Sequence, residues 1–123
     1  MSKKVLVIDD SSLIREKVHS ILRQNGYVAY DSSGGSKALA IARDVPVDLI
    51  ILDVRMPIMD GMAMYKELRS QGWGKHIPVI MLTSSDDAEV HTWMASEGLD
   101  EVKKDEAMEA RLLELLENRF GAS

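Results

Sequence analysis

The hydrophobic residues of the chain form two kinds of pattern, short continuous runs and longer stretches with helical spacing. The continuous runs are Val5–Ile8, Leu49–Leu52 and Val79–Leu82. Runs of this kind are typical of parallel strands that are buried on both faces. Two weaker strand candidates are Tyr27–Tyr30 and Leu99–Lys104, the second of which is interrupted by charges.

Helical spacing fills the segments between these runs. Apolar residues recur four, seven and eight positions after Ile14, and again after Met108, which predicts one buried face on each of two helices. Three further helices are expected over residues 34–45, 61–72 and 86–98, the last two ending on Gly. Strand and helix therefore alternate along the chain. This order predicts an α/β fold, a doubly wound (βα)5 five-stranded parallel sheet with helices on both faces.

The overall composition narrows the class of protein. A length of 123 residues fits one compact domain, so we predict a single domain over residues 1–123. The formal net charge of −5 argues against direct nucleic-acid binding. There is no cysteine, which excludes disulfides and thiolate metal sites. No apolar run approaches the length of a membrane span or a signal-peptide core, so we expect no membrane insertion and a cytoplasmic location.

Polar residues gather where the predicted strands end, at the edge where ligands bind in such sheets. The side chains expected together at this edge are Asp9, Asp10, Asp53, Thr83, and Lys103 or Lys104. Taken alone, each has an ordinary explanation as a helix cap, a turn residue or a solvated surface charge. Together, three carboxylates repel one another unless a proton or a cation lies between them. An all-oxygen cluster suits Mg²⁺, above all where phosphate is also bound.

Three segments, "VLVIDDSS", "LIILDVRMPIMDG" and "VIMLTSS", together resemble the receiver domain of two-component response regulators, the chemotaxis-regulator-like version of the flavodoxin-like fold. The resemblance covers essentially the whole chain. It implies that Asp53 is the phosphoacceptor, which takes a phosphoryl group from a phosphohistidine of a sensor histidine kinase or phosphotransfer protein. It also implies that phosphorylation switches the surface of the fourth helix, fifth strand and fifth helix for binding of a downstream target protein.

The resemblance further implies a metal site around the phosphoacceptor. Asp9 and Asp10 look like the acidic pair that organises Mg²⁺, with Mn²⁺ as the alternative ion. Asp10 and Asp53 would be direct ligands, and Asp9 would act partly through water. The backbone carbonyl of Arg55 would complete the protein's share of the coordination.

Other neighbours of the phosphoacceptor have implied roles in the same family. Thr83 looks like the switch hydroxyl that moves to bond a phosphoryl oxygen. Arg55 and Ser85 stand two residues beyond Asp53 and Thr83, at positions that face the phosphoryl group and tune its lifetime. Gly61 would shape the loop beneath the site, together with Pro57.

The fifth strand departs from the family pattern, which usually has an aromatic residue followed by Lys-Pro. This chain reads "GLDEVKKDEA" instead. Alignment without a gap puts Asp105 at the lysine position and Val102 at the aromatic position. A one-residue deletion puts Lys104 and Glu101 there. We predict Lys104, because a phosphoryl group beside three carboxylates needs a cation, with Lys103 or no lysine as the alternatives.

The leading interpretation is a receiver that undergoes Mg²⁺-dependent phosphorylation on Asp53. It is then not an enzyme for other substrates, since it catalyses only its own phosphorylation and dephosphorylation. The alternative is a degenerate receiver that serves as a phosphorylation-independent protein-interaction module, which the altered lysine region favours. A phosphohydrolase of aspartyl-phosphate type is disfavoured, because such enzymes generally need a carboxylate at the position of Arg55.

Overall fold

The strands of the protein form one parallel sheet in a computed structural model that describes residues 2–56, 59–84 and 88–121. The strands are Lys4–Ile8 (β1), Val28–Ser32 (β2), Leu49–Asp53 (β3), Val79–Thr83 (β4) and Asp100–Lys103 (β5). Their order in the sheet is β2-β1-β3-β4-β5, and every neighbouring pair is parallel. The predicted doubly wound parallel sheet is thereby confirmed.

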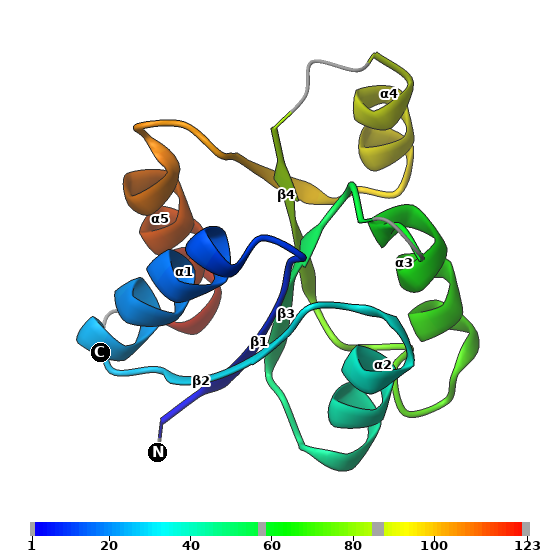
Figure 1. Cartoon of the computed structure of the whole chain (residues 1–123), viewed down its shortest axis with the longest axis horizontal. Helices are drawn as coiled ribbons and strands as arrows, with labels where there is room; N and C mark the ends of the chain where they lie inside the picture. The colour runs from blue at the N-terminus through cyan, green and yellow to red at the C-terminus, as the bar shows by residue number, and fades with distance from the viewer. Residues whose placement is uncertain (1, 57–58, 85–87, 122–123) are drawn as a thin grey trace.

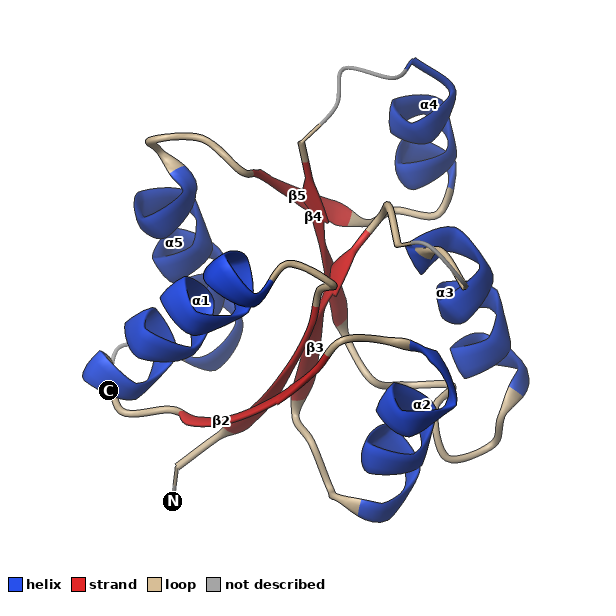
Figure 2. Ribbon diagram, in the orientation of Figure 1, coloured by secondary structure: helices blue, strands red, loops and turns tan. Residues whose placement is uncertain are grey.

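Helices cover both faces of this sheet. Within the described part of the chain they are Ser12–Gln24 (α1), Gly35–Asp44 (α2), Gly61–Ser70 (α3), Ala88–Ser96 (α4) and Met108–Phe120 (α5). Helices α1 and α5 lie on one face, and α2, α3 and α4 lie on the other (Figure 1). The result is a three-layer arrangement with the sheet in the middle (Figure 2). None of the described helices is both long enough and apolar enough to cross a membrane.

The strand residues alternate between two hydrophobic clusters, one under each layer of helices. Leu6, Ile50 and Leu52 belong to the cluster beneath α2, α3 and α4, whereas Val7 and Ile51 belong to the cluster beneath α1 and α5. Because successive strand side chains point to opposite faces, a strand covered on both faces needs an unbroken apolar run. The buried faces predicted from the spacing after Ile14 and Met108 are confirmed, since both face the second cluster.

Element boundaries differ from the predicted ones where pairing decides them rather than hydrophobicity. The strand predicted at Tyr27–Tyr30 starts at Val28 and runs to Ser32, because it pairs along the whole of β1 as an edge strand. Helix α3 ends at Ser70 with Gln71 as its cap, two residues before the end predicted at Gly72. Strands β3 and β4 include the polar residues that follow their apolar runs. The polar residues expected at the site, Asp53 and Thr83, are therefore the last residues of their strands.

Candidate functional site

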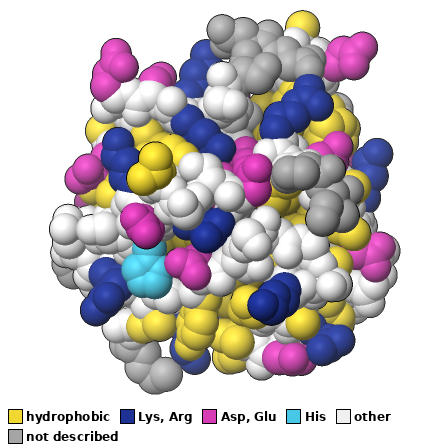
Figure 3. Space-filling model, in the orientation of Figure 1, with side chains coloured by type: hydrophobic (Ala, Val, Ile, Leu, Met, Phe, Trp, Pro, Cys, Tyr) yellow, Lys and Arg dark blue, Asp and Glu magenta, His cyan; other side chains and the backbone are white. Residues whose placement is uncertain are grey.

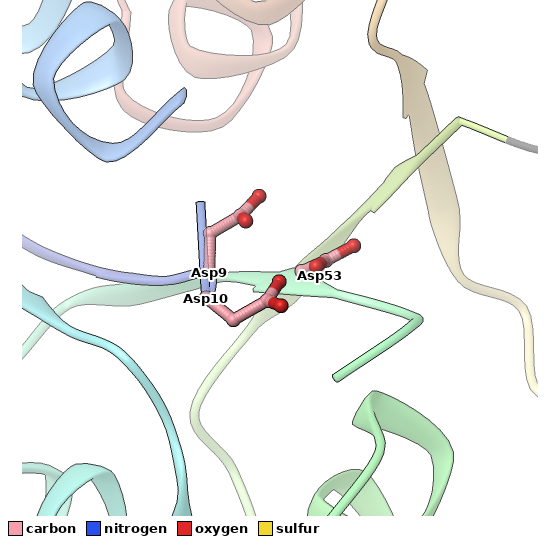
Figure 4. A group of neighbouring side chains, drawn as sticks. All are labelled: Asp9, Asp10 and Asp53. Carbon is pink, nitrogen blue, oxygen red and sulfur yellow. The ribbon is translucent and has the colours of Figure 1, made fainter. Parts of the chain in front are cut away.

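Three carboxylates meet at the carboxyl edge of the sheet. Asp9 follows β1, and its neighbour β3 ends at Asp53, so parallel pairing brings their side chains together. One carboxylate oxygen from each of Asp9, Asp10 and Asp53 lies within 4.8 Å of the other two. Figure 4 shows the three side chains projecting from the ends of β1 and β3 into the same space. Asp9 and Asp53 are buried, whereas Asp10 is exposed.

The turn after β1 is held in place by hydrogen bonds from Ser11 and Arg15 to the side chain and the backbone carbonyl of Asp9. The Ser11 backbone N–H donates to Asp9 Oδ1 at 2.9 Å, and Arg15 Nη1 donates to the Asp9 carbonyl at 2.8 Å. Ser11 is the N-cap of α1, because its side chain accepts the N–H of Ile14. The helix cap Ser11 and the carboxylate of Asp9 therefore belong to one turn. The hydrogen bond between them fixes the direction of the Asp9 carboxylate.

Lys104 supplies the ammonium of the site. Its Nζ lies 2.8 Å from Asp9 Oδ2 and 3.1 Å from Asp53 Oδ1. The Lys104 backbone N–H donates to the Thr83 carbonyl at 2.7 Å, which extends the β4–β5 pairing by one residue and aims the side chain inward. Of the other two residues considered for this position, Lys103 is exposed, and the side chain of Asp105 accepts the Ala107 N–H at the start of α5. The structure thus has the register that contains the one-residue deletion.

Burial and charge shift the pKa values of this pair in the same direction for different reasons. Burial, followed by the negative charge of Asp9, raises the pKa of Asp53 to about 6, although Lys104 and the Arg55 N–H pull it down. Burial alone would lower the pKa of Lys104, but its hydrogen bonds and charge interactions with Asp9 and Asp53 raise it above the ordinary value. The site therefore holds a protonated lysine beside a carboxylate that ionises reluctantly.

Two buried oxygens of the cluster retain unused binding capacity. Among the described residues, Asp53 Oδ2 has no hydrogen-bond partner, and Asp9 Oδ2 has none with good geometry although it lies close to Lys104. Buried carboxylate oxygens are normally satisfied, and Asp9 Oδ2 already lies beside the Lys104 ammonium, so Asp53 Oδ2 is the atom that points to a cation or donor that the site takes up. An all-oxygen donor set fits a hard divalent ion such as Mg²⁺, with Asp9, Asp10 and Asp53 as the residues that could hold it.

The start of α3 packs directly against the backbone of Asp53. A side-chain Cβ at Gly61 would lie 2.1 Å from the Asp53 carbonyl oxygen, a distance that no real contact allows. The Gly61 N–H donates to the Val54 carbonyl at 2.8 Å, and Asp60 caps the helix through the Ala63 N–H. Only glycine permits this close approach. The loop-shaping position predicted at Gly61 therefore has a steric explanation.

The remaining residues of the β3 and β4 loops are described only in part. The Arg55 backbone N–H donates to Asp53 Oδ1 at 3.3 Å, and the residue is exposed. Pro57 and Ser85 lie outside the described residues, so the roles predicted for them stay predictions.

A second polar cluster, which the sequence did not predict, continues from Thr83. Thr83 is buried, and its Oγ1 donates to Glu101 Oε2 at 2.5 Å. Glu101 Oε1 lies 3.3 Å from His91 Nδ1. The register with Lys104 in the site already placed Glu101 where the family has an aromatic residue, and this was the signal available in the sequence. Nothing in the spacing indicates His91, because α4 and β5 meet only through tertiary packing.

The surface shows no segregation of charge by sign on the side that faces the viewer in Figure 3, where acidic and basic side chains are interspersed. The chain has 15 basic and 20 acidic residues. Nucleic-acid binding normally requires basic groups gathered on one face. This side of the molecule gives no support for such an interface.

Comparison with known proteins places this arrangement in a family. Residues 5–117 match the family model of the response regulator receiver domain. The chain is 39% identical over 87 residues to the alkaline phosphatase synthesis transcriptional regulatory protein PhoP of Bacillus subtilis. The aligned segment covers 71% of this chain and 35% of PhoP. The chemotaxis response regulator CheY4 of Vibrio cholerae superposes with a TM-score of 0.84 at 34% identity, covering 96% of this chain and 98% of CheY4.

A third similar structure bears on the acidic cluster. The receiver domain of sensor histidine kinase PA1611 from Pseudomonas aeruginosa has a TM-score of 0.85 and 26% identity, with 100% of both chains covered. That structure was solved with a magnesium ion coordinated in its active-site cleft.

The doubly wound sheet has an acidic cluster and an ammonium at its carboxyl edge, where β4 also ends on the Thr83 hydroxyl. The chain belongs to the response regulator receiver domain family, the receivers of two-component systems. It spans about a third of the length of the curated relatives that it matches.

Proposed function

We propose that the chain is a phospho-receiver in which Asp53 accepts a phosphoryl group from a phosphohistidine of a sensor histidine kinase or phosphotransfer protein. The observation that carries this proposal is the position of the Lys104 ammonium, 3.1 Å from Asp53 Oδ1 and 2.8 Å from Asp9 Oδ2 in a buried carboxylate cluster. A cation held between buried carboxylates is suited to stabilise negative charge that arrives with a phosphoryl group.

Asp9, Asp10 and Asp53 are proposed to hold Mg²⁺, with Mn²⁺ as the alternative, and the Arg55 carbonyl is proposed as a further ligand. Support comes from the convergence of the three carboxylates and from the unused capacity of Asp53 Oδ2. The magnesium in the similar Pseudomonas aeruginosa receiver domain supports the same assignment. When bound, the ion would neutralise charge on the transferred group.

The residues of the chain have separable tasks in the proposed transfer. A carboxylate oxygen of Asp53 forms a bond to phosphorus while the nitrogen–phosphorus bond of the phosphohistidine breaks, and the released electron pair stays on the imidazole nitrogen, which takes up a proton. With its pKa raised to about 6, Asp53 is mostly ionised at neutral pH and able to attack. Lys104 turns from the Asp53 carboxylate toward the phosphoryl oxygens, to which Thr83 also donates.

Phosphorylation adds about 1.5 to 2 negative charges and strong acceptor oxygens at this edge of the sheet. We propose that the change reaches the surface of α4, β5 and α5, which then binds a downstream target protein. The chain would act on no external substrate beyond its phosphodonor. A second candidate is a receiver that binds its partner without phosphorylation. The observation that favours it is the Thr83 hydroxyl, which Glu101 already engages.

Phosphorylation with acetyl phosphate and Mg²⁺ tests the proposal without knowledge of the kinase. We expect the intact mass to rise by one phosphoryl group in wild type and to stay unchanged in Asp53→Asn. The matched control is Asp100→Asn, which removes an exposed carboxylate from β5 and should be phosphorylated like wild type. EDTA should abolish the gain in wild type and in Asp100→Asn. A wild-type mass that stays constant would favour the phosphorylation-independent module.

A further inference from the structure

The Thr83 side chain is held by a carboxylate instead of resting against an apolar neighbour. Its Oγ1 donates to Glu101 Oε2 at 2.5 Å, a short hydrogen bond with a charged acceptor. The other carboxylate oxygen, Oε1, lies 3.3 Å from His91 Nδ1 on α4. Glu101 therefore joins three elements, the end of β4, the middle of β5 and the first half of α4.

The register of the sheet brings Glu101 and Thr83 to the same side. Glu101 pairs with Met81 and Lys103 pairs with Thr83, so side chains at these positions share one face of β4 and β5. Met81 belongs to the cluster under α2, α3 and α4, which identifies the shared face as the α4 side. Glu101 is thus enclosed between Thr83 and α4, with its side chain 23% exposed.

A threonine hydroxyl has one proton to donate. In the structure that proton goes to Glu101. Thr83 follows Leu82, the residue that pairs with Asp53, and its backbone is fixed by the Lys104 N–H. A phosphoryl group on Asp53 can therefore receive the hydroxyl by rotation of the Thr83 side chain, but only if the bond to Glu101 is broken. The two acceptors compete for one donor.

We propose that Glu101 is a positioning residue that withholds the Thr83 hydroxyl in the unphosphorylated protein and transmits its release to α4 through His91. When Thr83 turns toward a phosphoryl oxygen, Glu101 Oε2 loses its donor. His91 contacts the same carboxylate. A change in the position of Glu101 after the release therefore reaches α4 through His91. This inference rests on the proposed phosphorylation of Asp53.

The competition sets a measurable threshold for occupancy of the phosphoryl site. Beryllofluoride with Mg²⁺ serves as the phosphoryl mimic, and the bound fluoride is followed by ¹⁹F NMR on the full chain. We expect Glu101→Ala to lower the half-saturating beryllium concentration by about tenfold, the value of one charge-assisted hydrogen bond that no longer opposes binding. Glu101→Gln retains a neutral acceptor of the same shape and should give a smaller shift. The matched control Asp100→Asn removes a carboxylate from the adjacent β5 position and should bind as wild type does.

A double-mutant cycle separates positioning from a general charge or folding effect. In a Thr83→Val background there is no hydroxyl to withhold, so Glu101→Ala should leave the half-saturating concentration unchanged. An equal shift of the half-saturating concentration in both backgrounds would overturn the inference. So would the lack of any shift when Glu101→Ala is made in the protein that keeps Thr83. Glu101→Gln keeps the test valid if Glu101→Ala fails to fold.

The link to α4 is tested with Trp93, which lies on α4. Its ring packs edge-on against the ring of Tyr65, with 5.5 Å between the ring centroids. Trp73→Phe leaves Trp93 as the single tryptophan of the chain. We expect His91→Ala to reduce the Trp93 fluorescence change at saturating beryllofluoride while the bound-fluoride signal persists. Thr92→Ala, an exposed neighbour on α4, is the control. A full fluorescence change in His91→Ala would refute transmission through His91.

Failure of the proposed function has a different signature. If wild type and every variant show no bound fluoride with Mg²⁺, the phospho-receiver proposal falls, and this inference falls with it. If wild type binds beryllofluoride and the Glu101 variants bind it equally well, the inference alone is refuted.

Discussion

The Lys104 ammonium lies 3.1 Å from Asp53 Oδ1, so a cation stands beside this buried carboxylate in the unmodified protein. The same ammonium contacts Asp9 Oδ2, and its side chain is only 13% exposed. A lysine in this position holds together two carboxylates that would otherwise repel each other.

Loss of this cation should therefore affect both stability and chemistry. We expect Lys104→Met to lower the free energy of unfolding by about 2 kcal/mol or more, because it leaves two buried carboxylates without their counterion. It should also slow phosphorylation by acetyl phosphate by at least about tenfold. Urea unfolding and intact mass measure the two effects. Lys103→Met is the matched control, and an equal loss in both variants would contradict the role assigned to Lys104.

The raised pKa of Asp53 predicts how stability changes with pH in metal-free protein. Because the folded pKa is about 6 and the unfolded value is 3.8, the stabilising contribution is present below about pH 4 and is lost as pH rises through 6. In Asp53→Asn the side chain cannot ionise, so this loss of stability with rising pH does not occur. At pH 7 in EDTA we expect the variant to be more stable than wild type by about 2 to 3 kcal/mol, with the difference vanishing near pH 4.

Urea unfolding at a series of pH values measures that difference. Subtraction of wild type from variant cancels the titration of all other groups, and Asp100→Asn shows what an exposed carboxylate contributes. A stability difference that does not depend on pH between 4 and 7 would mean that Asp53 ionises as easily in the folded protein as in the unfolded chain.

Removal of the exposed carboxylate should separate metal binding from stability. Since Asp10 is exposed, Asp10→Asn should leave the metal-free free energy of unfolding within about 0.5 kcal/mol of wild type. It should weaken Mg²⁺ binding by at least about tenfold, as a lost ligand does. Titration with Mg²⁺ monitored by thermal melting checks both points, because an ion that binds only the folded protein raises the melting temperature by an amount that grows with the logarithm of its concentration relative to the dissociation constant. Unchanged Mg²⁺ affinity would exclude Asp10 as a ligand.

The contact between α3 and β3 predicts a steric effect on the site. Gly61→Ala places a methyl group against the Asp53 carbonyl, so the helix or the strand must shift. We expect a loss of more than about 2 kcal/mol in unfolding free energy and slower phosphorylation of Asp53. Gly72→Ala is the control, because a Cβ there meets nothing within 4 Å. Equal stability of the two variants in urea would contradict this explanation.

The fold was predictable because a parallel sheet covered on both faces requires continuous apolar strands. Leu49–Leu52 and Val79–Leu82 meet that requirement, and both are central strands of the sheet. The edge strand was harder to predict, because the bounds of β2 are determined by its pairing with β1. The strand continues through Asp31 and Ser32, beyond its apolar part. The sequence contains no signal for that extension.

The site was predictable to the extent that strand ends determine it. Asp9, Asp53 and Thr83 share one edge of the sheet because parallel strands finish there. Lys104 was predicted from the need for a cation beside three carboxylates, and the β4–β5 register, which the Lys104 N–H to Thr83 carbonyl bond extends, places its side chain there. The contact of His91 with Glu101 depends on how α4 packs, and no local pattern in the sequence records that packing.

Adjacent residues of the acidic pair differ in their access to water, since Asp9 is fully buried and Asp10 is exposed. Mg²⁺ gives up its hydration waters reluctantly and usually keeps several of them in proteins. In the proposed magnesium site, the buried Asp9 would replace hydration waters on the side of the sheet, and the exposed Asp10 would leave the ion's other waters in contact with solvent. Exchange of the ion would then need no opening of the fold.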